Sequence, residues 1–339
     1  MWDESPTPEK KTIHTRFGII EIPKSHVLCK TPLGFKMTPY WQEQCTYMGQ
    51  QNVFKEAEQV IEKLVGQRVD AKQIERLVHS YGELLEQKQA VEEKVAIDEQ
   101  LHYGMLDGGM ILTREDDWKE MKLARIFSAK SHIETGKSKD LISLSRYVAH
   151  LGGHRAFFSK VEKCTDTLPN MVWIADGAKW IWEWVKESYP EATQILDYYH
   201  SKEKLCGFAK EVFVTKPEEI QPWVNQQEEL LLNDQVELVI ANITLMSCKR
   251  KTKALQRSLL TYYENNRCRM KYKTYRDQGM LIGSGPVEAA HRHVIQVRLK
   301  RSGQRWTLKG AQQVANLRTA RCSGEWEMVK NLIRNPNLN

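Results

Sequence analysis

The sequence lacks any long hydrophobic run. No uninterrupted apolar segment approaches the roughly 20 residues that a membrane-spanning helix requires, which predicts a protein without membrane contact. The first residues, MWDESPTPEKK, carry charges but no apolar stretch after them, so they do not resemble a secretory signal. We therefore expect a cytoplasmic protein.

Closely spaced cysteines are also missing. The seven cysteines lie far apart and none forms a C-x-x-C pair, so we expect neither a disulfide framework nor a structural zinc cage. A zinc site built from histidines is poorly supported as well. His150 and His154 have helical spacing, but Gly152 and Gly153 between them argue against a shared helix. Internal repeats and low-complexity tracts are absent from the sequence.

The composition is that of a globular protein with a modest basic surplus. Hydrophobic residues make up 41% and charged residues 27%, which excludes wholesale disorder. A chain of 339 residues is long enough for two or three lobes. Fifty Lys and Arg against 43 Asp and Glu give a net charge of +7, which fits a polyanionic partner without establishing one.

The N-terminal part changes from proline-rich to helical. Residues 51–95 carry apolar side chains at spacings of three and four, which is typical of amphipathic helices. Gly66 breaks this pattern, and Asp70 with Gln73 forms a capping box for a second helix. A helix, a short glycine turn and a capped helix are the outline of a helix-turn-helix, although any helical hairpin has the same pattern.

The remaining elements predict an α/β protein. Residues 101–129 have the pattern of an antiparallel meander of two or three strands, and residues 138–162 look helical. Residues 171–175 and 192–196 are short apolar runs with a helix between them, which indicates a parallel pair in a mixed sheet. Residues 198–275 are almost wholly helical and polar.

Three carboxylates stand out by their context. Asp107 interrupts an apolar strand, where a charge is costly unless it is paired or bound to a cation. Asp176 ends a short buried strand, a position at which open α/β sheets place ligand-binding groups. Glu288 lies in the first turn of a helix that follows Gly-Ser-Gly-Pro. Singly, each has an ordinary explanation as a turn residue or a helix-dipole partner; together they form a set of the hard oxygen ligands that divalent cations prefer.

Six sequence motifs occur in a characteristic order along the chain. They are YGMLDGG (103–109), WKEMK (118–122), IADG (174–177), ILDYYH (195–200), GSGPVE (283–288) and RLKRSGQRW (298–306). In this order they resemble the DDE transposases of bacterial insertion sequences, in the broad Mutator-like group. The resemblance covers about residues 50–330. It implies a ribonuclease-H-like mixed sheet with helices on both faces, interrupted by an all-helical insertion and preceded by a helical N-terminal region.

The resemblance also implies a division into four parts. Residues 1–95 are the N-terminal region with the candidate helix-turn-helix, and residues 96–204 are the first part of the catalytic core. Residues 205–275 are the helical insertion. Residues 276–339 are the C-terminal part of the core, with the Glu288 helix and the basic segment.

By resemblance, Asp107, Asp176 and Glu288 are the catalytic triad and hold two Mg²⁺ ions, for which Mn²⁺ can substitute. Such a site hydrolyses phosphodiester bonds at transposon ends and transfers the freed strand into target DNA. His200 matches a family histidine and receives a supporting role. Asp197 stays a rival for the second acid, because it too ends a strand.

Basic residues are the candidates for DNA contact. On a helix, Arg292 shares the face of Glu288, where it either binds phosphate or pairs with that carboxylate. The candidates in the basic segment 298–306 are Arg298, Lys300, Arg301, Arg305 and Trp306. The candidates in the helical insertion are Lys249, Arg250 and Lys251. Phosphate contacts would give affinity and Trp306 could stack on an unpaired base. The alternative is a solvated basic face with Trp306 in the core.

The implied partners are transposon-end inverted-repeat DNA and target DNA, bound by a homodimer or a larger assembly associated with the nucleoid. Two alternatives remain. One is a catalytically inactive, domesticated DNA-binding protein derived from a transposase. The other is a nuclease or resolvase of the same fold, which would cut without joining strands.

Overall fold

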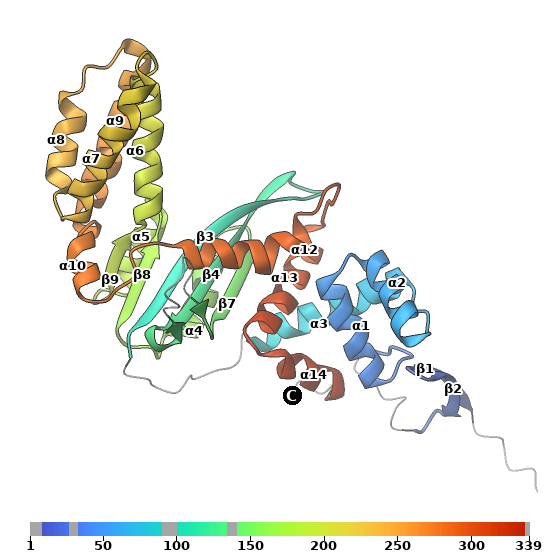
Figure 1. Cartoon of the computed structure of the whole chain (residues 1–339). Helices are drawn as coiled ribbons and strands as arrows, with labels where there is room; N and C mark the ends of the chain where they lie inside the picture. Colours follow the sequence, from blue (N-terminus) through green and yellow to red (C-terminus); the bar gives the residue numbers. More distant parts are fainter. Residues whose placement is uncertain (1–8, 27–32, 90–99, 134–140, 336–339) are drawn as a thin grey trace, which may run out of the picture.

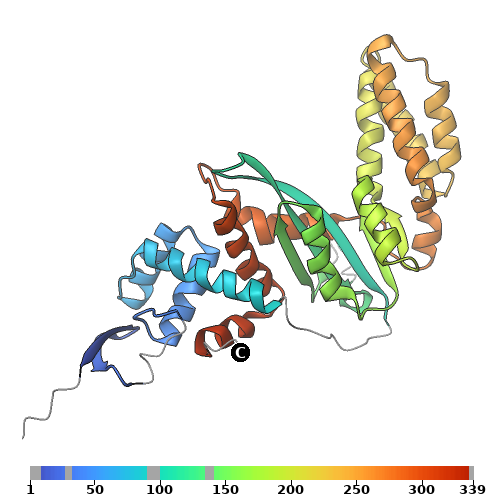
Figure 2. The ribbon, with the colours of Figure 1, turned by 180° about the vertical axis from the view of Figure 1, so that it is seen from behind.

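The computed structural model describes residues 9–26, 33–89, 100–133 and 141–335. The protein is mixed α/β, with one five-stranded sheet between a helical N-terminal unit and a projecting helical arm (Figures 1 and 2). Within the described ranges, no helix is both long enough and apolar enough to cross a membrane.

The N-terminal unit consists of a hairpin and three helices. They are β1 (Lys10–Thr15), β2 (Gly18–Pro23), α1 (Pro39–Gln51), α2 (Phe54–Val65) and α3 (Ala71–Gln89). The capped helix pair predicted from the sequence is present. α2 ends at Gly66, whose φ of 71° suits glycine, and the Asp70 carboxylate accepts a hydrogen bond from the Lys72 backbone N–H at 2.8 Å.

The central sheet has the strand order β7-β4-β3-β8-β9. Its strands are β3 (His102–Leu112), β4 (Trp118–Ser128), β7 (Arg146–Leu151), β8 (Met171–Ala175) and β9 (Thr193–Leu196). β4 is antiparallel to both β3 and β7, whereas β8 is parallel to β3 and β9 is parallel to β8. The antiparallel meander and the parallel pair expected from the sequence are therefore confirmed.

The helical expectation for residues 138–162 is wrong in its first half. The described part of this segment contains β6 (Leu141–Ile142), paired with β5 (His132–Ile133), then β7, and only then α4 (His154–Thr165). β7 forms because its backbone completes the edge of β4 while Val148 and Ala149 are buried, an environment that local propensity does not reveal.

Helices cover both faces of the sheet. α4 and α5 (Lys179–Ser188) lie on one face, and α11 (Gly285–Ala290) crosses the other (Figures 1 and 2). α11 continues as a π-helical stretch, His291–Gln296, and then as α12 (Val297–Leu299). α13 (Leu308–Cys322) packs against β7 and α3 and so joins the sheet to the N-terminal unit, while α14 (Trp326–Arg334) closes that unit.

The helical arm is inserted between β9 and α11 and projects from the sheet (Figure 1). Its helices are α6 (Tyr198–Val212), α7 (Ile220–Leu232), α8 (Val236–Leu245), α9 (Arg250–Asn266) and α10 (Tyr272–Asp277). Short 3-10 turns occur at Ala129–Ser131, Pro217–Glu219 and Arg267–Arg269. Leu205, Leu231, Ile243, Leu259 and Tyr263 are buried along the arm and form its core.

Candidate metal centre

Three aspartates stand in one row across the parallel strands. The strands pair through a row made of Met105, Ile174 and Ile195. Two residues further along each strand, the chain reaches Asp107, Asp176 and Asp197. Asp176 and Asp197 directly follow the last residues of β8 and β9, so all three aspartates lie at the same level along the parallel strands.

Asp107 lies on the face of β3 that α11 covers. The His291 ring, from the start of the π-helical stretch, packs directly over Gly109, where an added Cβ would lie 2.2 Å from the ring carbon Cε1. The ring is held in place because His291 Nε2 lies 3.2 Å from the Met121 carbonyl oxygen. Glycine at position 109 therefore lets the imidazole approach the strand beside the carboxylate.

Burial raises the pKa of Asp107, which favours the neutral acid over the carboxylate. His291 and His200 oppose this shift through their charge, and Asp176 adds to it. All three groups are thus within electrostatic reach of Asp107. A cation at this place would relieve the repulsion between the two aspartates.

Asp176 is exposed and follows directly on β8, whose five residues are all buried. Its carboxylate accepts a hydrogen bond from the Ala178 backbone N–H at 3.0 Å, which fixes the turn. Gly177 lies against the ring of Tyr262 in α9, and an added Cβ would come within 2.1 Å of that ring. The arm therefore folds back onto the turn that carries Asp176.

Asp197 is fully buried and its carboxylate accepts several hydrogen bonds. It accepts from the Tyr199 backbone N–H at 2.7 Å, from Ser284 and from His200. Burial by itself would raise the pKa of Asp197, but the hydrogen bonds from His200 and Ser284 outweigh it and the pKa is lowered. Asp197 is thus an ionised N-cap of α6 that ties the start of α6 to the loop before α11.

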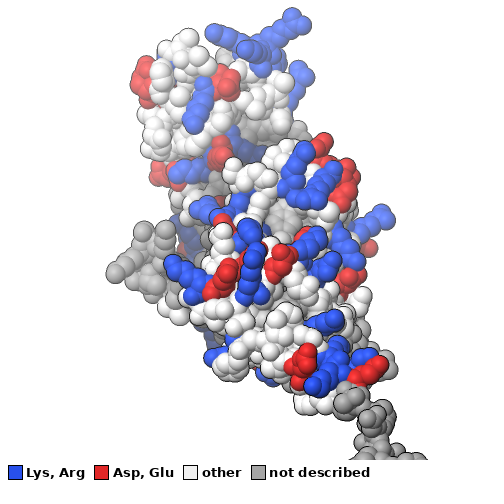
Figure 3. Space-filling view, turned by 90° about the vertical axis from the view of Figure 1, so that its right-hand side faces the viewer, with Lys and Arg blue, Asp and Glu red and all other residues white. Residues whose placement is uncertain are grey.

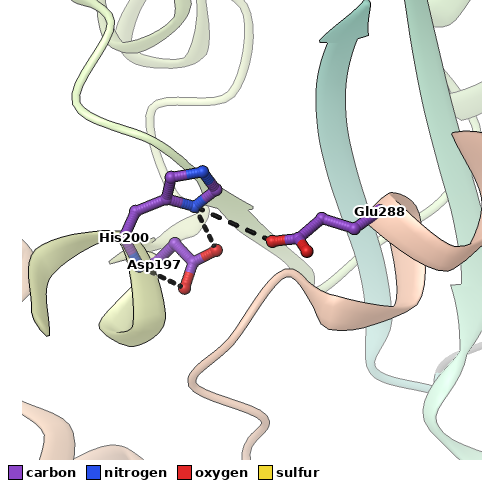
Figure 4. A group of neighbouring side chains, drawn as sticks. All are labelled: Asp197, His200 and Glu288. Carbon is purple, nitrogen blue, oxygen red and sulfur yellow. Dashed lines mark hydrogen bonds and ion pairs between the residues drawn. The ribbon is translucent and has the colours of Figure 1, made fainter. Parts of the chain in front are cut away.

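His200 lies between two carboxylates (Figure 4). Its Nδ1 is 2.8 Å from Asp197 Oδ2 and 4.0 Å from Glu288 Oε1. The hydrogen bond with Asp197, together with the charges of Asp197, Glu288 and Asp176, raises the pKa of His200 to about 9 despite partial burial. The positive charge on this imidazole marks a place where the surrounding acids favour a cation.

Glu288 reaches this place because the start of α11 is anchored. Ser284 donates to Asp197 through its backbone N–H and its hydroxyl. Gly283 packs against the Tyr199 ring, where a Cβ would lie 2.4 Å from Cε2. On the other side, the Arg125 guanidinium donates to the Pro286 carbonyl at 2.8 Å. These contacts hold the first turn of α11 over the sheet edge.

Asp197, His200 and Glu288 form a group that could hold a metal ion, since their ligand atoms lie within 4.8 Å of one another. Asp197 is buried, while His200 and Glu288 are partly buried. The group offers two carboxylates, and carboxylate oxygens are the donors that Mg²⁺ and Mn²⁺ prefer. The residues present therefore fit a divalent cation.

The structure places the predicted site residues unevenly. It brings Asp107, Asp176, Glu288 and His200 to one edge of the sheet. Asp197, the alternative candidate for the second acid, lies in the same group as His200 and Glu288. Arg292 is exposed and, among the described residues, forms no ion pair with Glu288.

Trp306 is 8% exposed and packs against Phe54 of the N-terminal unit, as the alternative with this ring in the core expected, so it is not free to stack on a base. Arg298 is 1% exposed, which corrects its assignment to the solvated basic segment; it packs against the same Phe54 ring. Lys300 and Arg301 are exposed, and Arg301 is paired with Glu56. Arg305 is also exposed and lies 3.6 Å from Asp117.

The second basic cluster lies where the chain passes from α8 to α9, at the far end of the arm. Lys249, Arg250 and Lys251 are all exposed there. Figure 3 shows Lys and Arg projecting at the upper end of the molecule, whereas acidic and basic side chains are mixed over the lower part of that face. The cluster is therefore remote from the carboxylates.

Sequence reasoning missed three parts of this site. The contact of His291 with Gly109 depends on helix α11 crossing the sheet, so no local pattern of residues indicates it. Ser284 and Tyr262 had no signal of their own. Tyr262 has a buried hydroxyl that bonds to no described group, and burial, with Asp176 and Asp197 adding, raises its pKa.

No protein-family model matches the chain. A curated protein from Streptococcus gallolyticus, described as "UPF0236 protein in vanSb 3'region", is 24% identical over 308 residues. The alignment covers 86% of this chain and 65% of that relative, so the chain spans slightly less than two thirds of the relative's length. Its description states no activity.

Proposed function

We propose that the protein is a metal-dependent DNA transposase with a ribonuclease-H-like core and a DDE triad of Asp107, Asp176 and Glu288. The observation that carries the proposal is the convergence of acids far apart in the sequence. Glu288 Oε1 lies 4.0 Å from Nδ1 of His200, and Asp107 and Asp176 each interact electrostatically with the same imidazole. These three acids are the ones that the sequence motifs imply.

The residues divide into ligands and positioning groups. Asp107, Asp176 and Glu288 would hold two Mg²⁺ ions, and bound ions of this kind activate a nucleophilic oxygen and stabilise the leaving oxygen of a phosphodiester. Asp197 has most of its hydrogen-bonding capacity filled by α6 and Ser284, which suits positioning better than ligation. His200 is oriented by Asp197 and directs its charge toward Glu288.

The proposed reaction needs alignment more than covalent chemistry by the protein. The carboxylates would hold the cations that neutralise charge on the phosphodiester and would fix their positions, so that water cleaves at a transposon end and the freed 3′-hydroxyl attacks target DNA. Two ends must be brought together for this, so the proposal includes a homodimer or larger assembly on DNA, at the nucleoid.

The test is cleavage and joining with linear DNA that contains the sequences flanking this gene. Wild-type protein with Mg²⁺ or Mn²⁺ is expected to release 3′-hydroxyl ends and to form joined products. Asp107→Asn, Asp176→Asn and Glu288→Gln are expected to bind the DNA and to cut nothing. Asp277→Asn, in an exposed ion pair with Lys273 on α10, is the control and should keep full activity.

Other outcomes separate the alternatives. Cutting without joined products would identify a nuclease or resolvase, and binding without cutting by the wild type would identify an inactive DNA-binding protein. Full cleavage by Asp107→Asn would exclude the proposed site.

A further inference from the structure

Asp176 is weakly restrained by its own surroundings in the chain. It is exposed, and the described hydrogen bond of its carboxylate comes from Ala178, within the same turn. Asp107, by contrast, lies inside the long strand β3, and Asp197 accepts hydrogen bonds from Tyr199, His200 and Ser284. Carboxylates that bind metals are usually oriented by further residues around them. For Asp176, such residues must come from outside its turn.

The first outside contact is made by the ring of Tyr262, in α9 of the arm. It packs so closely against Gly177, the residue after Asp176, that a Cβ at position 177 would lie 2.1 Å from Cε2 of the ring. Within the arm, Lys204 of α6 lies over the same ring, with Nζ 4.8 Å from its centre. The Tyr262 hydroxyl is buried and bonds to no described group. The contact with the turn therefore depends on the ring and not on the hydroxyl.

The second outside contact acts through Trp182 in α5. Its indole N–H donates to the Asp176 carbonyl oxygen at 2.8 Å, which fixes the backbone of the turn. The guanidinium of Arg269 lies over this indole, 4.6 Å from the ring centre, an arrangement that attracts a cation. Arg269 is itself held, because its Nε donates to Gln194 Oε1 of β9 at 2.8 Å. Arg269 therefore holds Trp182 in the position from which it bonds to Asp176.

Both contacts come from the end of the arm that adjoins the sheet. Tyr262 lies near the end of α9, and Arg269 belongs to the 3-10 turn that follows. This turn packs against β9, and Figure 1 shows the arm on the side of the sheet formed by β8 and β9. The base of the arm thus contacts the Asp176 turn directly at Gly177 and indirectly through Trp182.

We propose that Tyr262 and Arg269 are positioning residues that hold Asp176 at the metal centre, so that the helical arm completes the site. That Asp176 binds the metal rests on the proposed function, whereas the grip of the arm on its turn rests on the two contacts. Tyr262 and Arg269 act on the cation only through Asp176. The arm therefore contributes to metal affinity although Asp107, Asp176 and Glu288 all lie outside it.

The test measures Mn²⁺ binding by the full chain without DNA, at a temperature below the unfolding midpoint of every variant. Tyr262→Leu removes the flat ring beside Gly177, so its affinity for Mn²⁺ should fall about 10- to 100-fold, the usual effect of losing a group that orients a ligand. Arg269→Met should lower the affinity by about tenfold, at the lower end of that range, because the Trp182 hydrogen bond can still form. Tyr262→Phe keeps the ring and should keep the affinity, since the hydroxyl has no described partner to lose.

Ile243→Ala separates positioning of Asp176 from general support of the arm. Ile243 is buried in the core of the arm on α8, a helix that makes neither of the two contacts. Loss of its side chain should lower the thermal midpoint of the protein and leave the affinity for Mn²⁺ unchanged. If Ile243→Ala lowers the affinity as much as Tyr262→Leu does, Tyr262 only supports the fold of the arm and the positioning role is wrong.

The remaining outcomes distinguish this role from the proposed function. If the wild type, Tyr262→Leu and Arg269→Met bind Mn²⁺ equally well, the arm does not hold Asp176, and the metal-dependent function is unaffected. If Tyr262→Phe loses as much affinity as Tyr262→Leu, the hydroxyl acts in place of the ring, which also overturns the positioning role. If the wild type binds no Mn²⁺, the metal-dependent function fails and the positioning role fails with it.

Discussion

Nδ1 of His200 lies 2.8 Å from the carboxylate of the fully buried Asp197, and this contact holds the imidazole against Glu288. The pair comes from a strand end and from the first turn of the helix that follows. It gives the candidate metal centre a positive group that its own acids stabilise. The consequences can be measured.

The first prediction concerns protonation. The pKa of His200 is raised to about 9, so in the metal-free protein it is charged at neutral pH. The stabilisation that the charged pair provides is fully present below about pH 6.5, the ordinary histidine value, and is lost as the pH rises through about 9. NMR titration of labelled histidines should find one imidazole that titrates near pH 9. In Asp197→Asn this resonance should titrate closer to pH 6.5, and a wild-type value there would contradict the assignment.

The second prediction separates the two aspartates that compete for the second place in the triad. Asp176→Asn should abolish metal-dependent cleavage, because it removes a proposed ligand. Asp197→Asn should lower the rate about 10- to 100-fold, the usual effect of losing a group that orients a ligand. It should leave some activity at raised Mn²⁺. Cleavage rates of both variants, measured over a range of Mn²⁺ concentrations, distinguish the ligand from the positioning residue. If Asp197→Asn abolished cleavage and Asp176→Asn only slowed it, Asp197 would be the ligand.

The third prediction concerns the close contact of Gly109 with His291. Gly109→Ala inserts a methyl group where the ring carbon lies 2.2 Å from the Cβ position, so it should lower the free energy of unfolding by about 1–3 kcal/mol. Gly207→Ala is the matched control, since its Cβ meets nothing within 4 Å and it lies inside α6. That change should be neutral or stabilise by about 0.5–1 kcal/mol. Urea unfolding measures the free energy of unfolding of both variants. Equal values would show that the strand moves to accommodate the added methyl group at position 109.

The fourth prediction tests the tip of the arm. Replacing Lys249, Arg250 and Lys251 by Ala should weaken binding to duplex DNA in a way that depends little on sequence. It should also reduce the slope of log affinity against log salt by about 0.9 for each DNA phosphate that the variant no longer neutralises. The control replaces three exposed lysines outside the arm, Lys63, Lys179 and Lys186. An unchanged slope in the first variant would show that the arm does not contact DNA.

Much of the local structure could be predicted from the sequence because its causes are local. The Asp70 cap, the Gly66 helix end and the meander of 101–129 follow from short-range patterns. β7 could not be predicted, since Arg146–Leu151 becomes a strand only when β4 offers its edge. The burial of Arg298 and Trp306 has the same origin, because the N-terminal unit that covers them is about 250 residues away in the chain.

The sequence by itself determined which acids end strands or begin helices, because those positions follow from hydrophobic runs and turn residues along the chain. Only the tertiary structure decided that Asp107, Asp176 and Asp197 lie at the same level of the sheet, since this depends on parallel pairing between strands that are distant in sequence. It also decided that Asp197 is enclosed by hydrogen bonds while Asp176 stays exposed. Burial, and with it the charge that a carboxylate can carry, is a property of the packed molecule and not of its order of residues.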